Sequence, residues 1–214
     1  MSLVAMCETG LLKGVISQNI DGLHRKSGIK PDKLWELHGN TNLEFCKNCD
    51  KAYMRDFRCR RDFNKYNIHK TDRKCDNPRC KGDLYDSIIN FGEDLRDDVL
   101  NPAWDVGTDA DLMLSMGSSL RVTPACDIPL EMTGYGGKLV IVNLQKTPLD
   151  KNADLVIHGR IQNVMSILME KLNMKIPEFR INRYMQVSLN NNKLIVDGVD
   201  SNGDPYTIFN AKKA

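Results

Sequence analysis

Two pairs of cysteines carry the clearest chemical signal in the sequence. Two residues separate Cys46 from Cys49, and four residues separate Cys75 from Cys80. Thiolates paired at such short spacings are typical of a tetrahedral zinc site, and a site with four protein sulfurs leaves no position for water. We therefore predict a structural, non-catalytic zinc ion bound by Cys46, Cys49, Cys75 and Cys80.

Other potential ligands lie close to these pairs in the sequence. Cys59 and His69 fall within the 25 residues between the pairs, and either could replace one of the four cysteines. Cys7 and Cys126 stand in apolar surroundings and are expected to be buried without a chemical role. Seven cysteines, four of them in close pairs, suit metal binding in a reducing compartment better than a disulfide framework. The protein is therefore expected to be intracellular.

Composition limits the classes of protein that fit. A chain of 214 residues suits one large domain with a small inserted module. With 41% hydrophobic and 27% charged residues, the composition is that of a globular protein. The net charge of +2 does not require a nucleic-acid partner, and direct nucleic-acid binding is left open. No apolar run approaches the roughly 20 residues that a membrane-spanning helix needs, so no membrane association is expected.

The elements that must position any site are short apolar runs. Residues 14–17, 112–116 and 139–142 each end abruptly in small or polar residues, and a fourth run covers 154–158. Uninterrupted apolar runs of this length predict strands that are covered on both faces, as in a parallel α/β sheet. The polar residues that follow would then meet at the carboxyl edge of the sheet, where such folds bind ligands. Ordinary turn residues are the alternative reading of each segment.

The rest of the chain has three different patterns. Residues 161–172 show one apolar stripe at helical spacing, which indicates a packing helix. Residues 44–86 have few periodic apolar positions, so a bound metal is expected to replace a core there. We predict a Rossmann-like parallel sheet (1–43 and 87–178), an inserted zinc-ribbon module (44–86) and a carboxyl-terminal β-hairpin extension (179–214).

Several motifs, in the right order, resemble the sirtuins (the Sir2 family), which are NAD-dependent protein lysine deacylases. The motifs are Gln18–His24, Glu36–Asn40, Cys46-x-x-Cys49, Ile89–Glu93, Gly117–Leu120 and Ile141–Asn143. The resemblance extends over about residues 3–178. Within the family, residues 117–124, 136–145 and 153–159 resemble the class IV, chromatin-associated branch.

The resemblance implies catalytic roles for three residues: His38, Asn19 and Asp21. His38 matches the general base that takes a proton from a ribose hydroxyl, a task that suits imidazole near neutral pH. Gln18 and Asn19 match residues that hold ribose and an ordered water. Ile20 and Asp21 match residues that contact the nicotinamide amide.

The resemblance also implies NAD as a cofactor and an acyl-lysine protein as substrate. Further NAD-binding positions, on the adenosine side, are Gly117, Ser118, Ser119, Asn143, Leu144 and Ile161. The substrate peptide would pair as an added strand with Ile89, Phe91, Gly92 and Glu93. Asn90 stands where many relatives carry an apolar residue, which leaves the acyl-chain preference open.

One departure from the family pattern concerns the amino-terminal part. The family's glycine-rich loop, which offers backbone N–H groups to the dinucleotide phosphates, is absent, and so is a Pro-Asp-Phe-Arg segment. Residues 1–12 match the helix that precedes the Gln18 strand. We therefore expect the sheet to lack a central strand, and the chain as given to bind NAD weakly and turn over little.

The predicted function is NAD-dependent deacylation of a protein, histone or another chromatin protein, in the nucleus. The acyl group would pass to ADP-ribose with release of nicotinamide. Two alternatives remain. One is a catalytically impaired, zinc-stabilised fragment that binds acyl-lysine or chromatin, and the other is a mono-ADP-ribosyltransferase.

Overall fold

The computed structural model describes residues 1–60, 69–180, 184–190, 193–199 and 205–207. The chain divides into two compact units. The first unit comprises Met1–Asn19, Leu23–His38 and Phe91–Phe179. The second comprises Ile20–Gly22, Gly39–Asn90 and the described residues from Arg180 onward.

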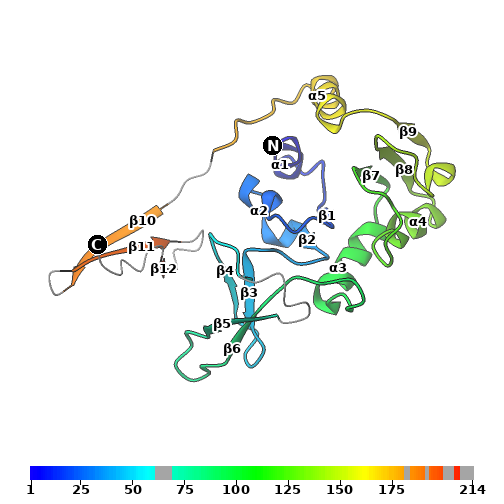
Figure 1. Cartoon of the computed structure of the whole chain (residues 1–214). Coiled ribbons are helices and arrows are strands. Elements are labelled where there is room, and N and C mark those ends of the chain that lie inside the picture. Colours follow the sequence, from blue (N-terminus) through cyan, green and yellow to red (C-terminus); the bar gives the residue numbers. More distant parts are fainter. Residues whose placement is uncertain (61–68, 181–183, 191–192, 200–204, 208–214) are drawn as a thin grey trace. The chain divides into compact units, whose positions relative to one another are not determined.

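The first unit contains two small groups of parallel strands (Figure 1). Strands β7 (Leu112–Met116), β8 (Lys138–Val142) and β9 (Leu155–Ile157) pair in that order, and β1 (Val15–Ser17) pairs with β2 (Leu34–Glu36). Leu139, Ile141 and Val142 are at most 1% exposed, which explains why β8 is apolar without alternation. The predicted α/β architecture with a parallel sheet is confirmed.

Helices cover these strands. They are α1 (Ser2–Glu8), α2 (Leu23–Ser27), α3 (Asp97–Thr108), α4 (Asp127–Gly134) and α5 (Ile161–Lys171), with short 3-10 turns at Pro31–Lys33 and Asp150–Asn152. The stripe on α5 packs Met165 and Met169 against Ala5 and Met6 of α1, as expected of a packing helix. Ala103 of α3 and Ile128 of α4 form a second cluster with Leu37, next to the predicted base.

The edges of the parallel strands are partly open. Within the described part of the chain, β1 and β7 belong to separate sheets, and no strand pairs with the free edge of β7. Leu112, at the start of β7, is 58% exposed, although its type and position suit a covered strand.

The second unit contains an antiparallel sheet in the order β4-β3-β6-β5 (Figure 1). Its strands are β3 (Leu43–Cys46), β4 (Ala52–Met54), β5 (Lys70–Lys74) and β6 (Asp83–Asp86). Alternation along β3 and β6 buries Glu44, Cys46, Leu84 and Asp86. Because two of these four are acidic, apolar periodicity does not reveal the strands.

The carboxyl-terminal residues form strands as predicted. Strand β10 (Tyr184–Asn190) pairs antiparallel with β11 (Lys193–Val199), which also pairs with β12 (Pro205–Thr207). The helices in the described residues are too short or too polar for any of them to span a bilayer.

Candidate functional site

The four predicted zinc ligands come together in the second unit. The sulfurs of Cys46, Cys49, Cys75 and Cys80 all lie within 4.8 Å of one another. The Cys46 and Cys80 sulfurs are 3.5 Å apart, and those of Cys49 and Cys75 are 3.6 Å apart. A tetrahedral zinc ion with bonds of about 2.3 Å holds its sulfurs about 3.8 Å apart. The cluster therefore fits a structural zinc ion.

The ionisation of these thiols also favours a bound cation. Burial alone would raise the pKa of Cys46, but backbone N–H groups of Asn48 and Cys49 and the neighbouring sulfurs lower it to about 7. The backbone N–H of Lys51 favours the Cys49 thiolate, yet burial and the other three sulfurs raise the pKa of Cys49 to about 12. Four adjacent thiolates repel one another, so they need a divalent cation to ionise together.

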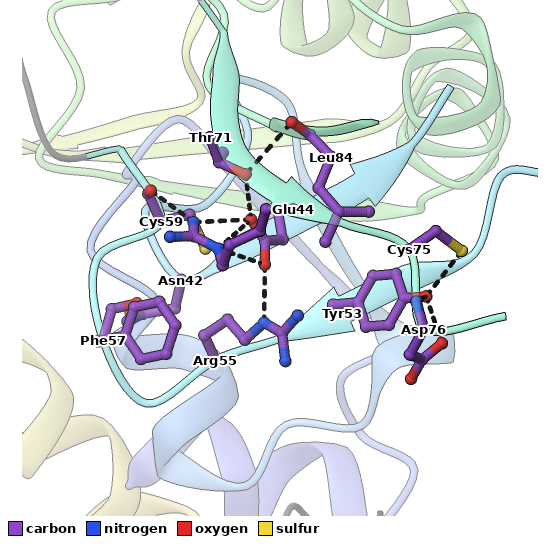
Figure 2. A network of polar contacts seen from close by, with 11 residues as sticks. Asn42, Glu44, Tyr53, Arg55, Phe57, Cys59, Thr71, Cys75, Asp76 and Leu84 are labelled. Atoms are coloured by element: carbon purple, nitrogen blue, oxygen red, sulfur yellow. Dashed lines mark hydrogen bonds and ion pairs between the residues drawn. The ribbon is translucent and has the colours of Figure 1, made fainter. Parts of the chain in front are cut away.

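Tyr53 supports the cluster from β4 (Figure 2). Its hydroxyl oxygen lies 3.0 Å from the Cys75 sulfur and donates to Asp76 Oδ1 at 2.6 Å. The same oxygen accepts the Asp76 backbone N–H at 3.1 Å. The Tyr53 hydroxyl and Lys51 lower the pKa of the Asp76 carboxyl. Outer contacts of this kind orient metal ligands.

A buried ionic network lies beside the zinc cluster (Figure 2). The Glu44 side chain is fully buried and accepts from Arg55 at 2.8 Å, Thr71 at 2.7 Å and Arg73 at 2.8 and 2.9 Å. Burial alone would raise the pKa of Glu44, but these three donors together hold it below its ordinary value. Arg73 also donates to the Cys59 carbonyl at 2.6 Å, which ties the chain after β4 to β5.

Cys59 and His69 do not join the zinc cluster. Cys59 is fully buried, and burial raises the pKa of its thiol to about 12. His69 Nδ1 lies 3.1 Å from Asp86 Oδ1. The metal-ligand group found among the described residues is the four cysteines that the spacing predicted.

His38 follows β2 and contacts the segment that follows β1. Its Nδ1 atom lies 3.1 Å from the Gln18 carbonyl oxygen, and the Leu37 backbone N–H donates to the Ser17 carbonyl at 2.9 Å. Because β1 and β2 are parallel, their carboxyl ends bring Gln18, Asn19 and His38 to one edge. Asn19 is fixed there by a hydrogen bond from its N–H to Ser17 Oγ at 3.1 Å.

Two other predicted residues belong to the second unit. The Ile20 carbonyl accepts the Thr41 backbone N–H at 2.8 Å, so Ile20 is anchored to the chain just ahead of β3. Asp21, the next residue, also lies in this unit. The structure therefore groups Gln18 and Asn19 with His38, and places Ile20 and Asp21 in a different compact unit.

A hollow of about 390 Å³ lies at the carboxyl ends of β7, β8 and β9. It is lined by Gly117, Asn143, Leu144, Gln145, Gly159, Arg160, Ile161 and Gln162. Gly117 has φ +66°, and a Cβ there would lie 3.0 Å from Ile161 Cδ1, so only glycine fits without strain. Four of the predicted adenosine-side residues line this hollow, whereas Ser118 and Ser119 are outside the lining set.

Sequence reasoning missed four residues of the hollow: Gln145, Gly159, Arg160 and Gln162. Gln145 follows β8, Gly159 and Arg160 lie between β9 and α5, and Gln162 is the second residue of α5. These residues could have been predicted. Residues 154–158 indicate a strand, and ligands bind beyond the carboxyl ends of parallel strands, so the residues that follow were candidates for the site.

The predicted substrate segment spans the boundary of the two units. Ile89 belongs to the second unit, and Phe91, Gly92 and Glu93 belong to the first. Phe91 is 85% exposed, which is high for a large aromatic side chain.

Comparison with known protein families identifies the family of the chain. A model described as "Sir2 family" matches residues 2–124. The chain belongs to the Sir2 family.

Individual Sir2-family relatives match beyond that range. "NAD-dependent protein deacetylase SRT1" of Arabidopsis thaliana is 46% identical over 179 residues, which cover 84% of this chain and 37% of that protein. "NAD-dependent protein deacetylase Sirt6" of Drosophila melanogaster is 37% identical, covering 84% of this chain and 57% of that protein. A solved structure described as "Sir2-p53 peptide-NAD+" matches with a TM-score of 0.63 and 36% identity, covering 80% of this chain and 68% of that one. The chain thus spans only part of the length of these two curated relatives.

Proposed function

We propose that this chain carries the catalytic site of an NAD-dependent protein lysine deacylase. The observation that supports it most directly is the 3.1 Å contact between His38 Nδ1 and the Gln18 carbonyl oxygen. A carbonyl only accepts, so Nδ1 is the donor, and in the neutral ring Nε2 is then the nitrogen that can act as a base. An unprotonated His38 Nε2 at the carboxyl edge of parallel strands could remove a proton from a sugar hydroxyl.

The residues around His38 suit a dinucleotide. NAD, when bound, would supply the ADP-ribose that accepts the acyl group as nicotinamide leaves. We assign Gln18 and Asn19 to the ribose and an ordered water, and Ile20 and Asp21 to the nicotinamide amide. His38, Asn19 and Asp21 form the proposed catalytic set.

The adenosine side is assigned to the hollow beyond β7, β8 and β9. Its walls combine apolar side chains with polar groups, as in small-molecule sites generally. His158 supports this part of the site, since its Nδ1 lies 3.0 Å from the Asn143 carbonyl oxygen. The proposed adenosine-side residues are Gly117, Ser118, Ser119, Asn143, Leu144 and Ile161.

The proposed substrate is an acyl-lysine protein. Exposure of Phe91 supports this assignment, because an extended peptide could pair along Ile89, Phe91, Gly92 and Glu93 and cover the ring. The matched structure described as a Sir2 complex with a p53 peptide and NAD+ supports a peptide substrate. We propose a histone or another chromatin protein as target, a place in the class IV branch and a nuclear location, on the motif resemblance. Zinc-binding thiolates fit a reducing intracellular compartment.

Nicotinamide release from NAD tests the proposal. The chain is assayed with an acetyl-lysine peptide and with the unmodified peptide, both alone and with the family's glycine-rich segment added ahead of Met1. We expect release that depends on the acetyl group, and faster with the added segment because its N–H groups bind phosphate. Selective peptide binding without release from either version would instead indicate a binding fragment, and transfer of ADP-ribose to protein would indicate a mono-ADP-ribosyltransferase.

A further inference from the structure

A chain of polar contacts lies behind the proposed substrate segment, within the second unit. His69 Nδ1 is 3.1 Å from Asp86 Oδ1, and its Nε2 is 3.3 Å from Asn90 Nδ2. Arg60 donates to Asn90 Oδ1 at 3.4 Å. These contacts link the ends of β5 and β6 to Asn90, the residue between Ile89 and Phe91.

The partners determine where the protons lie. The Arg60 guanidinium only donates, so Asn90 presents its oxygen to Arg60 and its NH₂ group to His69. His69 Nε2 must then accept, and the ring proton sits on Nδ1, which donates to Asp86. The neutral His69 ring therefore bridges Asp86 and Asn90, so the position of Asn90 depends on that of Asp86. We call the contacts from Asp86 through His69 to Asn90 the relay.

Several contacts fix the position of the Asp86 side chain. Its side chain is 1% exposed, and its Oδ1 also accepts the Ile88 backbone N–H at 3.0 Å. The Asp86 backbone N–H donates to the His69 carbonyl at 2.8 Å, so strand pairing and side chains fix the same two residues. The Arg60 side chain is only 8% exposed, and its Nε lies 4.0 Å from Asp86 Oδ2. At this separation the two groups attract each other without a hydrogen bond, so the contacts that fix Asp86 are those with His69 and Ile88.

A second set of contacts holds the start of the same segment. Ser87 Oγ accepts the Asn40 backbone N–H at 3.0 Å and donates to the Asn40 carbonyl at 3.0 Å. The segment is therefore held at Ser87 by Asn40, and at Ile88 by Asp86. Ile89 lies between Ile88 and Asn90, which His69 and Arg60 hold.

We propose that Asn90 is a positioning residue, and that the Asp86–His69–Asn90 relay, with Arg60, sets the geometry of the segment that receives the acyl-lysine peptide. The inference rests on the proposed deacylase function. The contacts with His69 and Arg60 hold the Asn90 side chain within the second unit. Asn90 accordingly controls peptide affinity and leaves acyl-chain preference to other residues.

Peptide titration tests the relay. Dissociation constants for an acetylated, a propionylated and an unmodified peptide are measured with the unaltered chain, Asn90→Leu, His69→Phe and the double variant. Lys70→Ala is the matched control, because Lys70 neighbours His69 but pairs with Asp83 outside the relay. Zinc content, measured alongside, verifies that each variant keeps the fold of this unit.

We expect each single variant to weaken binding of both acylated peptides by the same factor, about tenfold, as for the loss of a buried hydrogen bond. The double variant should weaken peptide binding little more than either single variant does, because the relay acts as one unit. Long-range ¹H–¹⁵N spectra of the unaltered chain should show His69 with its proton on Nδ1.

Three results would overturn the inference: unchanged peptide affinity in Asn90→Leu, a changed ratio between acetylated and propionylated peptides, or a His69 proton on Nε2. Equal binding of acetylated and unmodified peptide by the unaltered chain would contradict the deacylase function itself, and the positioning role with it. Selective binding that Asn90→Leu leaves intact would contradict only the positioning role.

Discussion

The imidazole of His38 donates from Nδ1 to the main-chain oxygen of Gln18, 3.1 Å away. In the neutral ring, this contact assigns the proton to Nδ1 and makes Nε2 the acceptor. His38→Gln should reduce acetyl-dependent nicotinamide release at least about 100-fold, the lower range for loss of a general base. Peptide binding and zinc content should stay unchanged.

His24→Gln serves as the control for His38, because His24 lies on α2 and has no role in the proposed site. Comparable rates in His38→Gln and the unaltered chain would remove His38 from the mechanism. Loss of activity in both variants would point to a general effect on folding.

Removal of one zinc ligand should unfold the second unit. Cys46→Ser is expected to reduce bound zinc from one ion per chain to none, because a structural site contributes its binding free energy to folding. Metal analysis and protease resistance of residues 39–60 measure the effect. Cys126→Ser, at a buried cysteine of the other unit, should retain the zinc. A Cys46→Ser chain that keeps a full equivalent of tightly bound zinc would show that the site has another ligand.

Stability at low pH should depend on Glu44. Its pKa is lowered in the folded chain, so its contribution is complete above the ordinary value of 4.5 and is lost as the pH falls through the folded value. Glu44→Gln should lower the free energy of unfolding by about 3–5 kcal/mol at pH 7, because Arg55 and Arg73 lose a buried partner. Between pH 5 and pH 3, the free energy of unfolding should fall less in this variant than in the unaltered chain, as measured by urea denaturation.

Two further variants test the Glu44 argument. Thr71→Val removes one donor and keeps the shape of the side chain, so a smaller loss of about 1 kcal/mol is expected. Glu8→Gln changes an exposed carboxylate and should leave the pH profile as it is. An acid profile that is as steep in Glu44→Gln as in the unaltered chain would refute the role of Glu44.

Where one residue type dominated, the sequence predicted the structure well. The apolar run 112–116 is β7, and the stripe from Ile161 begins α5 at the same residue. The cysteine spacing identified all four members of the sulfur cluster, because one ion can bind only side chains that converge. The division of the chain into domains and the roles of single NAD-site residues stay predictions.

The antiparallel sheet of the second unit could not be predicted from apolar periodicity. Its inward positions include Glu44 and Asp86, whose partners Arg73 and His69 lie far along the chain. Such pairing depends on tertiary contacts and leaves no local pattern. Helix α3 was missed for a similar reason: Pro102 and Gly107 lie within it, and both have poor helix propensity.

Gly39, which follows the proposed base His38, should tolerate no side chain, because it lies against the backbone of Ser87 and Ile88. A Cβ at Gly39 would lie 1.8 Å from the Ser87 carbonyl oxygen, and its φ is +81°. Gly10 has a similar φ of +78° with nothing within 4 Å, so Gly10→Ala measures backbone strain alone, about 1 kcal/mol. Gly39→Ala should lower the free energy of unfolding by at least about 2 kcal/mol more than Gly10→Ala does, since the backbone of Ser87 must move. Urea denaturation measures both values. Gly39→Ala should also weaken acetylated-peptide binding, whereas equal losses in the two variants would show that the approach of Gly39 to Ser87 is loose enough to yield.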